Sequence, residues 1–112
     1  METTLKEAVL VCADAALAGS ATADAVVRIL SDTLIRKGEA SLALSGGRTP
    51  QLFFRLLAAE PYLSTLEWKC ISVFWGDERC VPPDHPDSNY RMANRLLLTK
   101  VPIPAENIHR IK

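Results

Sequence analysis

Residues 41–50 read SLALSGGRTP, and this stretch decides the fold class. It opens with a short, mostly apolar run of strand length, which the glycine pair then ends. Thr49 and Pro50 are typical of a helix start, with Thr49 as the N-cap and Pro50 as the first helical residue. We therefore predict a strand, a tight turn and a helix, the unit from which parallel α/β sheets are built.

The same pattern precedes this stretch. Residues 8–12 form an apolar run of strand length, and Asp14 is a good N-cap for a helix that ends at Gly38, a residue suited to the left-handed position after a helix. Gly19 disfavours the helix interior, so the helix begins either after Asp14 or at Ser20. Apolar residues at three- and four-residue spacing give it one buried face: Ala23, Val26, Val27, Leu30 and Leu34.

The pattern also continues downstream. The helix that starts near Thr49 ends by Pro61, and residues 70–75 are nearly all apolar, as expected for a parallel strand covered on both faces. Asp87 or Ser88 caps a further helix through residue 98, and residues 107–111 are a fourth strand candidate. We predict an α/β fold with a three-layer, Rossmann-like parallel sheet, in a single domain spanning residues 1–112.

Composition excludes several classes of protein. The chain has 112 residues, with 13 Lys and Arg against 13 Asp and Glu, so no basic excess points to a nucleic-acid partner. No apolar run is long enough to cross a membrane, and no secretory signal is visible. Cys12, Cys70 and Cys80 are odd in number and lack C-x-x-C spacing, which indicates free thiols in a reducing compartment. We expect a cytoplasmic protein.

The glycine turn is a candidate anion site. Gly46 and Gly47 leave the backbone open to a ligand, a helix N-terminus follows, and the Arg48 guanidinium suits phosphate oxygens. Thr49 belongs to the same turn. The alternative is a tight turn in which the glycines serve backbone geometry and Thr49 serves only as a cap, because the sequence is not one of the defined phosphate-loop motifs.

A second candidate follows the third predicted strand. Asp77, Glu78 and Arg79 lie just past its carboxyl end, so they and the glycine turn open onto the edge where parallel sheets bind ligands. Asp77 can orient a reacting group and Arg79 can stabilise negative charge on an oxygen, whereas Glu78 is better interpreted as part of a solvated turn. The nearby acidic residues and His85 match no defined metal-site spacing, and we predict no metal.

Three motifs together resemble the 6-phosphogluconolactonases, within the superfamily that also holds the glucosamine-6-phosphate isomerases. They are LALSGGRTP at 42–50, FWGDERCVP at 74–82 and HPDSNYR at 85–91, and a Pro-Ile-Pro stretch follows at 102–104. The resemblance covers nearly the whole chain in the right order. It implies the phosphosugar isomerase and lactonase fold, and hydrolysis of 6-phosphogluconolactone in the oxidative pentose phosphate pathway without metal or cofactor.

The resemblance also implies which residues act. Gly46, Gly47 and Arg48 match the family's substrate-binding loop, and Asp77 and Arg79 match its active-site loop. Two further binding candidates, Ser88 and Asn89, lie at the adjoining helix start. Family members are longer and carry a later Gly-x-Asp-Gly-His-Thr motif, whose histidine activates water.

Because that motif is not among the 112 residues, we expect the chain to correspond to the first part of such an enzyme and, in isolation, to lack the catalytic histidine. Two alternatives remain open. The first is an enzyme resembling glucosamine-6-phosphate deaminase, and the second is a non-catalytic module that binds a sugar phosphate.

Overall fold

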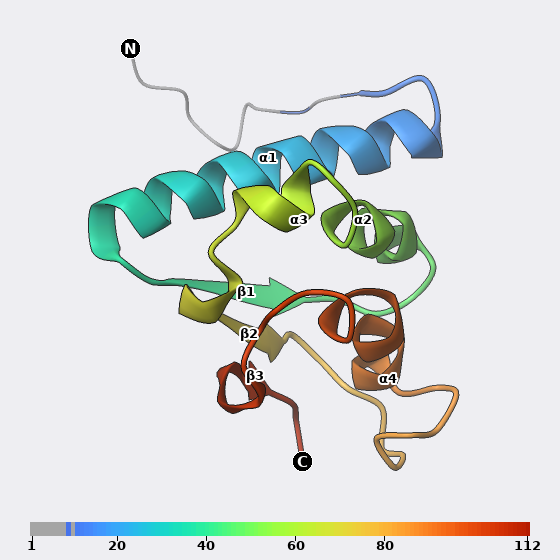
Figure 1. The fold of residues 1–112 in the computed structure, drawn as a ribbon. Helices are drawn as coiled ribbons and strands as arrows, with labels where there is room; N and C mark the ends of the chain where they lie inside the picture. Colours follow the sequence, from blue (N-terminus) through green and yellow to red (C-terminus); the bar gives the residue numbers. More distant parts are fainter. Residues whose placement is uncertain (1–8, 10) are drawn as a thin grey trace.

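The computed structural model describes residue 9 and residues 11–112 (Figure 1). Three parallel strands lie in the order β1-β2-β3, with helices between them. The predicted α/β class and parallel sheet are confirmed. In chain order the elements are α1 (Ala15–Lys37), β1 (Ala40–Leu44), α2 (Thr49–Leu57), α3 (Tyr62–Thr65), the 3-10 turn η2 (Trp68–Cys70), β2 (Ile71–Trp75), α4 (Asn89–Ala93), the π-helical turn η3 (Asn94–Leu98), the 3-10 turn η4 (Ala105–Asn107) and β3 (Ile108–His109).

Helix α1 is the longest element, and its ends follow the predicted signals. The Asp14 carboxylate accepts a hydrogen bond of 2.8 Å from the Leu17 N–H, and Gly38 closes the helix with a φ of +80°. The helix therefore begins after Asp14 and passes through Gly19. A Cβ on Gly19 would lie 2.9 Å from Cδ2 of Leu52, so this glycine allows α1 and α2 to approach closely.

Strand β2 has one buried and one more exposed face. Ile71, Val73 and Trp75 are buried, whereas Phe74 is 41% exposed. The prediction that both faces of this strand are covered is wrong for the part of the chain that the structure describes. Apolar composition led to that prediction, but composition reports side-chain type and not the presence of a covering layer.

The predicted outer strands differ from the observed ones. The strand predicted over residues 8–12 includes Ala8 and Leu10, which lie outside the described residues, while Val9 and Val11 are exposed and belong to no strand. The strand predicted over 107–111 is only the two-residue β3, because η4 includes residue 107 and residues 110 and 111 pair with no strand among the described residues.

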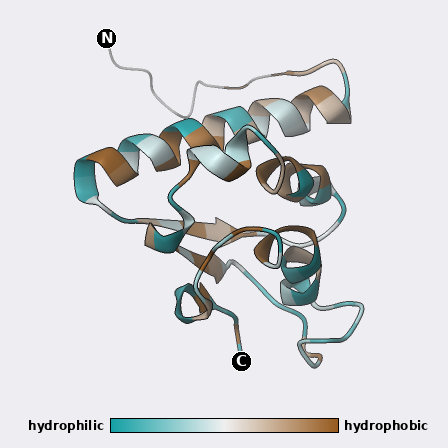
Figure 2. Ribbon diagram, in the orientation of Figure 1, coloured by the Kyte–Doolittle hydropathy of each residue, from teal (hydrophilic) through white to brown (hydrophobic). Residues whose placement is uncertain are grey.

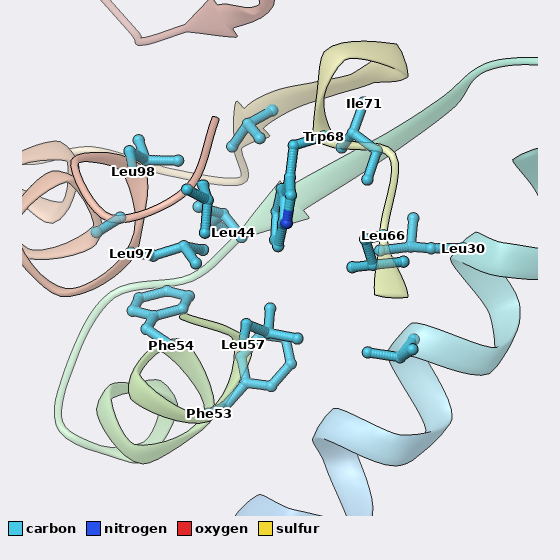
Figure 3. Packing of buried hydrophobic residues seen from close by; sticks show 14 of the residues in the cluster. Leu30, Leu44, Phe53, Phe54, Leu57, Leu66, Trp68, Ile71, Leu97 and Leu98 are labelled. Carbon is cyan, nitrogen blue, oxygen red and sulfur yellow. The ribbon is translucent and has the colours of Figure 1, made fainter. Parts of the chain in front are cut away.

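One apolar core joins the helices to the sheet. Figure 3 shows Leu30 of α1, Phe54 and Leu57 of α2 and Leu97 of η3 pointing into the same space as Leu44 of β1. In Figure 2 the strands are mostly brown, while the long loop after β2 is mostly teal or pale. Among residues 9 and 11–112, no helix has the length and hydropathy needed to cross a membrane.

Candidate active site

Two loops leave the sheet side by side at its carboxyl edge. Leu44 and Trp75 are paired in the β1–β2 register, and the Gly76 N–H donates to the Leu44 carbonyl at 3.0 Å. The loop 45–48 and the loop 76–88 therefore begin at neighbouring positions. The prediction that both motifs open onto one edge is confirmed.

A pocket of about 670 Å³ lies between these loops. Arg48 from the first loop and Arg79 from the second both line it, so two arginines border one cavity. Both side chains are exposed and available to a ligand. The remaining lining residues are Gly47, Gln51, Pro86, Asp87, Ser88, Asn89 and Met92. The guanidinium group of arginine suits a phosphate or carboxylate ligand.

The two glycines of the first loop have different roles. Gly47 has a φ of +87°, a left-handed conformation that other residues adopt only with strain. Gly46 is required for space, because a Cβ there would lie 2.0 Å from Oδ1 of Asn89. The glycine pair thus brings the first loop against the start of α4.

The Glu78 carboxylate fastens the second loop to α4. Its Oε1 accepts hydrogen bonds from the N–H groups of Arg79 at 2.8 Å and Asn89 at 2.6 Å. Its Oε2 accepts from the Ser88 hydroxyl at 2.9 Å and the Tyr90 N–H at 3.0 Å. Partial burial alone would raise the pKa of Glu78, but these four donors outweigh it and hold the pKa below its ordinary value.

Ser88 and Asn89 are buried, and their polar groups bind other parts of the protein. Ser88 is 2% exposed, and its hydroxyl accepts from the Arg91 N–H as the N-cap of α4. Asn89 is 5% exposed, and its Nδ2 lies 3.3 Å from both the carbonyl and Oδ1 of Asp77. Of the two predicted caps for this helix, Ser88 is the one used.

Asp77 and Thr49 are not among the residues that line the arginine pocket. Asp77 is exposed beside Asn89 but does not line that pocket. Thr49 lines a different cavity of about 750 Å³, between α1 and α2, which Arg48 also borders. Its predicted role as N-cap is wrong by one residue, because α2 already begins at Thr49 and Arg48 occupies the cap position without a side-chain hydrogen bond.

Neither histidine of the chain lines the arginine pocket. The Nδ1 of His85 accepts a hydrogen bond of 3.0 Å from the Asp87 N–H, and the His109 ring stacks on Phe74 with centroids 4.6 Å apart. Within residues 9 and 11–112, no three His, Cys, Asp or Glu side chains gather as a metal ion would require.

Sequence reasoning missed the role of Glu78. The familiar capping box pairs a Ser or Thr cap with an acidic residue three positions later in the same helix. Here the acidic residue precedes its partners Ser88, Asn89 and Tyr90 by 10–12 residues and belongs to another loop. No local spacing marks such a contact.

The fold and site together define an α/β protein with a pocket lined by two arginines at the carboxyl edge of a parallel sheet. Residues 13–112 match the family described as glucosamine-6-phosphate isomerases/6-phosphogluconolactonase. The chain belongs to this family, as the motifs predict.

Individual relatives agree with this assignment. The chain is 51% identical to the 6-phosphogluconolactonase of Haemophilus influenzae over 71 residues, covering 63% of this chain and 31% of that protein. It is 42% identical to the 6-phosphogluconolactonase of Nostoc over 107 residues, covering 96% of this chain and 43% of that protein. The 6-phosphogluconolactonase structure from Trypanosoma brucei superposes with a TM-score of 0.80 at 33% identity, covering 90% of this chain and 38% of that one. The chain thus spans well under half the length of these relatives.

Proposed function

We propose that this chain provides the substrate-binding and charge-stabilising part of a 6-phosphogluconolactonase, which hydrolyses 6-phosphogluconolactone to 6-phosphogluconate. The observation that carries the proposal is the pair Arg48 and Arg79 on one pocket at the sheet edge. The names of the relatives supply the substrate. We place the protein in the cytoplasm, as the sequence predicts, and its three cysteines are free thiols.

The two arginines have different roles in this proposal. Arg48 follows the open turn of Gly46 and Gly47 and binds the substrate phosphate, which is the fixed anion of the molecule. Arg79 lines the same pocket and stabilises the oxyanion that forms when water attacks the lactone carbonyl. Asp77, two residues before Arg79 in the chain, orients the lactone end of the substrate.

Hydrolysis also requires a general base that activates the water. His85 and His109 lie off the pocket, so neither is assigned this role. The residues of this chain therefore bind the substrate and stabilise the oxyanion, and none of them is assigned the role of the base. The alternative reaction, deamination of glucosamine 6-phosphate, has less support because the relatives with substantial identity are named as lactonases.

Isothermal calorimetry with 6-phosphogluconate tests the proposal. Arg48→Ala should weaken binding by about 1.5 to 3 kcal/mol, the range for a charge-assisted hydrogen bond, which is roughly a tenfold to hundredfold rise in Kd. Arg79→Ala should weaken it similarly, because the C1 carboxylate of this product takes the place of the lactone carbonyl. Arg55→Ala is the matched control, since this exposed arginine is in the last turn of α2 and does not line the pocket.

Equal affinity in all three variants would remove the arginine pocket from the proposal. A parallel titration with glucosamine 6-phosphate distinguishes the two reactions of the family. Tighter binding of the amino sugar than of 6-phosphogluconate would favour the deaminase.

A further inference from the structure

The start of α4 is attached to the 76–88 loop by one carboxylate. Glu78 accepts from the backbone N–H groups of Asn89 and Tyr90, the Ser88 hydroxyl and its own neighbour Arg79. These four bonds occupy both carboxylate oxygens, two donors to each. The side chain therefore has no free acceptor geometry for a substrate, although it lies beside the pocket residues Arg79 and Ser88.

Asn89 connects this attachment to the rest of the site. Its N–H is the closest of the four donors, at 2.6 Å from Glu78 Oε1. Its side chain donates to the Asp77 carbonyl and carboxylate, and it fills the space left by the missing side chain of Gly46. A shift of Asn89 would consequently break its contacts with Asp77 and change the packing against the glycine turn.

We propose that Glu78 is a positioning residue of the sugar-phosphate pocket, acting through Asn89 to hold the loops 45–48 and 76–79 at their working separation. The inference rests on the proposed function and adds to it a residue that touches no substrate. It predicts that affinity for the sugar phosphate depends on a side chain whose contacts are all internal.

This role requires both acceptor oxygens of the ionised Glu78 carboxylate. A glutamine has one acceptor oxygen in place of two, and its NH₂ group would face the Tyr90 N–H, donor against donor. The Ser88 hydroxyl can rotate to accept from that NH₂, but a backbone N–H cannot. Glu78→Gln therefore keeps the size of the side chain and disrupts the hydrogen bonds at the start of α4.

The first experiment compares Glu78→Gln with Glu67→Gln in the full 112-residue chain. Among the residues that the structure describes, the Glu67 carboxylate makes only an exposed ion pair with Lys69, at 3.6 Å, so the same chemical change there is the control. We expect Glu78→Gln to weaken 6-phosphogluconate binding about tenfold, as loss of one charged hydrogen bond would. We also expect the side-chain NH₂ resonances of Asn89 to shift, and neither effect in Glu67→Gln.

A purely local helix cap would give a different result. In that case Glu78→Gln would change the backbone amides of Asn89 and Tyr90 but leave the Asn89 side-chain resonances and the affinity at wild-type values, which would overturn the inference. Should Glu78→Gln fold poorly, Glu78→Asp replaces it. That variant keeps the charge and shortens the reach, and the same two readouts apply.

A second variant tests the route through Asn89. Gly46→Ala displaces the Asn89 side chain while leaving Glu78 intact, so adding Glu78→Gln to it should cost little further affinity. If the losses of affinity in the two single variants add fully in the double variant, Glu78 does not act through Asn89. If the wild-type chain does not bind 6-phosphogluconate, the proposed function fails by itself. In that case the Asn89 side-chain resonances of Glu78→Gln decide the inference. A shift of these resonances supports it, and unchanged resonances overturn it.

Discussion

Gly46 shows how one missing side chain fixes the distance between two loops. A Cβ at this position would lie 2.0 Å from Oδ1 and 2.3 Å from Cγ of Asn89, and Asn89 is buried. Because its Nδ2 donates to Asp77, Asn89 cannot move without breaking that contact. Glycine is thus required at this position for space.

We predict that Gly46→Ala destabilises the chain by about 1 to 3 kcal/mol, the usual cost of forcing extra atoms into a packed site. Gly76→Ala is the control, since its Cβ would lie 3.9 Å from the nearest atom, the Leu44 carbonyl oxygen, which is an ordinary contact. Urea unfolding followed by circular dichroism gives both values. Similar stability of the two variants would mean that Asn89 moves aside freely.

Glu78 gives a prediction about pH. Partial burial raises its pKa, but the donors from Tyr90, Asn89, Arg79 and Ser88 prevail, so its pKa is lower in the folded state than in the unfolded chain. A group of this kind stabilises the fold above its unfolded pKa, about 4.3 for glutamate, and loses that contribution as pH falls through the lower folded value.

The stability difference between the wild-type chain and Glu78→Gln should therefore be constant near neutral pH and shrink on acidification below about pH 4.3. Thermal unfolding of both proteins at a series of pH values measures it. A difference that grows as the pH falls would contradict the direction of the shift.

At the scale of single elements, α1 has the clearest signals. Asp14 accepts from the Leu17 N–H at 2.8 Å, and the carboxylate also lies at the positive end of the helix dipole. Asp14→Ala should cost about 1 kcal/mol of stability. Asp32→Ala is the comparison, because within the described part of the chain the Asp32 carboxylate makes only an exposed ion pair, with Arg36 of the same helix, and alanine favours the helix interior.

Chemical denaturation midpoints of these two variants check the capping role. The Asp14 variant should be clearly less stable, and the Asp32 variant should lie close to the wild type. An equal loss in both would mean that general helix electrostatics, and not the cap, stabilises α1.

The elements also show how far sequence reasoning reaches. Asp14 and Gly38 predict the ends of α1 because caps depend on one or two residues within a turn. The strand residues before Gly46 and Asp77 predict that both loops share an edge, because parallel strands end together. The link from Glu78 to α4 could not be predicted, since it joins residues distant in the chain through backbone groups that carry no sequence signal.

At the scale of the whole molecule, the pocket is bordered by other elements, whereas one face of the sheet is exposed. The arginine pocket is bordered by two loops, α2 and α4, all held by the core, whereas Phe74 lies exposed on the sheet with His109 stacked on it. The apolar character of residues 70–75 predicts a covered strand correctly for one face. Whether a second layer covers the other face depends on parts of a protein that a strand's own composition does not encode.

The distribution of titratable groups over the whole molecule leads to a prediction about activity. Hydrolysis of a lactone near neutral pH needs a base that takes a proton from water, and histidine is the side chain with the suitable ordinary pKa. His85 is engaged by the Asp87 N–H and His109 stacks on Phe74, so neither histidine borders the pocket where Arg48 and Arg79 would hold the substrate.

We therefore predict that the 112-residue chain binds 6-phosphogluconate but does not accelerate 6-phosphogluconolactone hydrolysis above the spontaneous rate. The assay follows lactone loss in buffer, with the wild-type chain, and with the Arg48→Ala variant as the binding-deficient control. Acceleration by the wild type alone would contradict the prediction. His85→Gln and His109→Gln would then identify the base, because loss of activity in one of them would require that histidine to reach the pocket by a movement of its loop or strand.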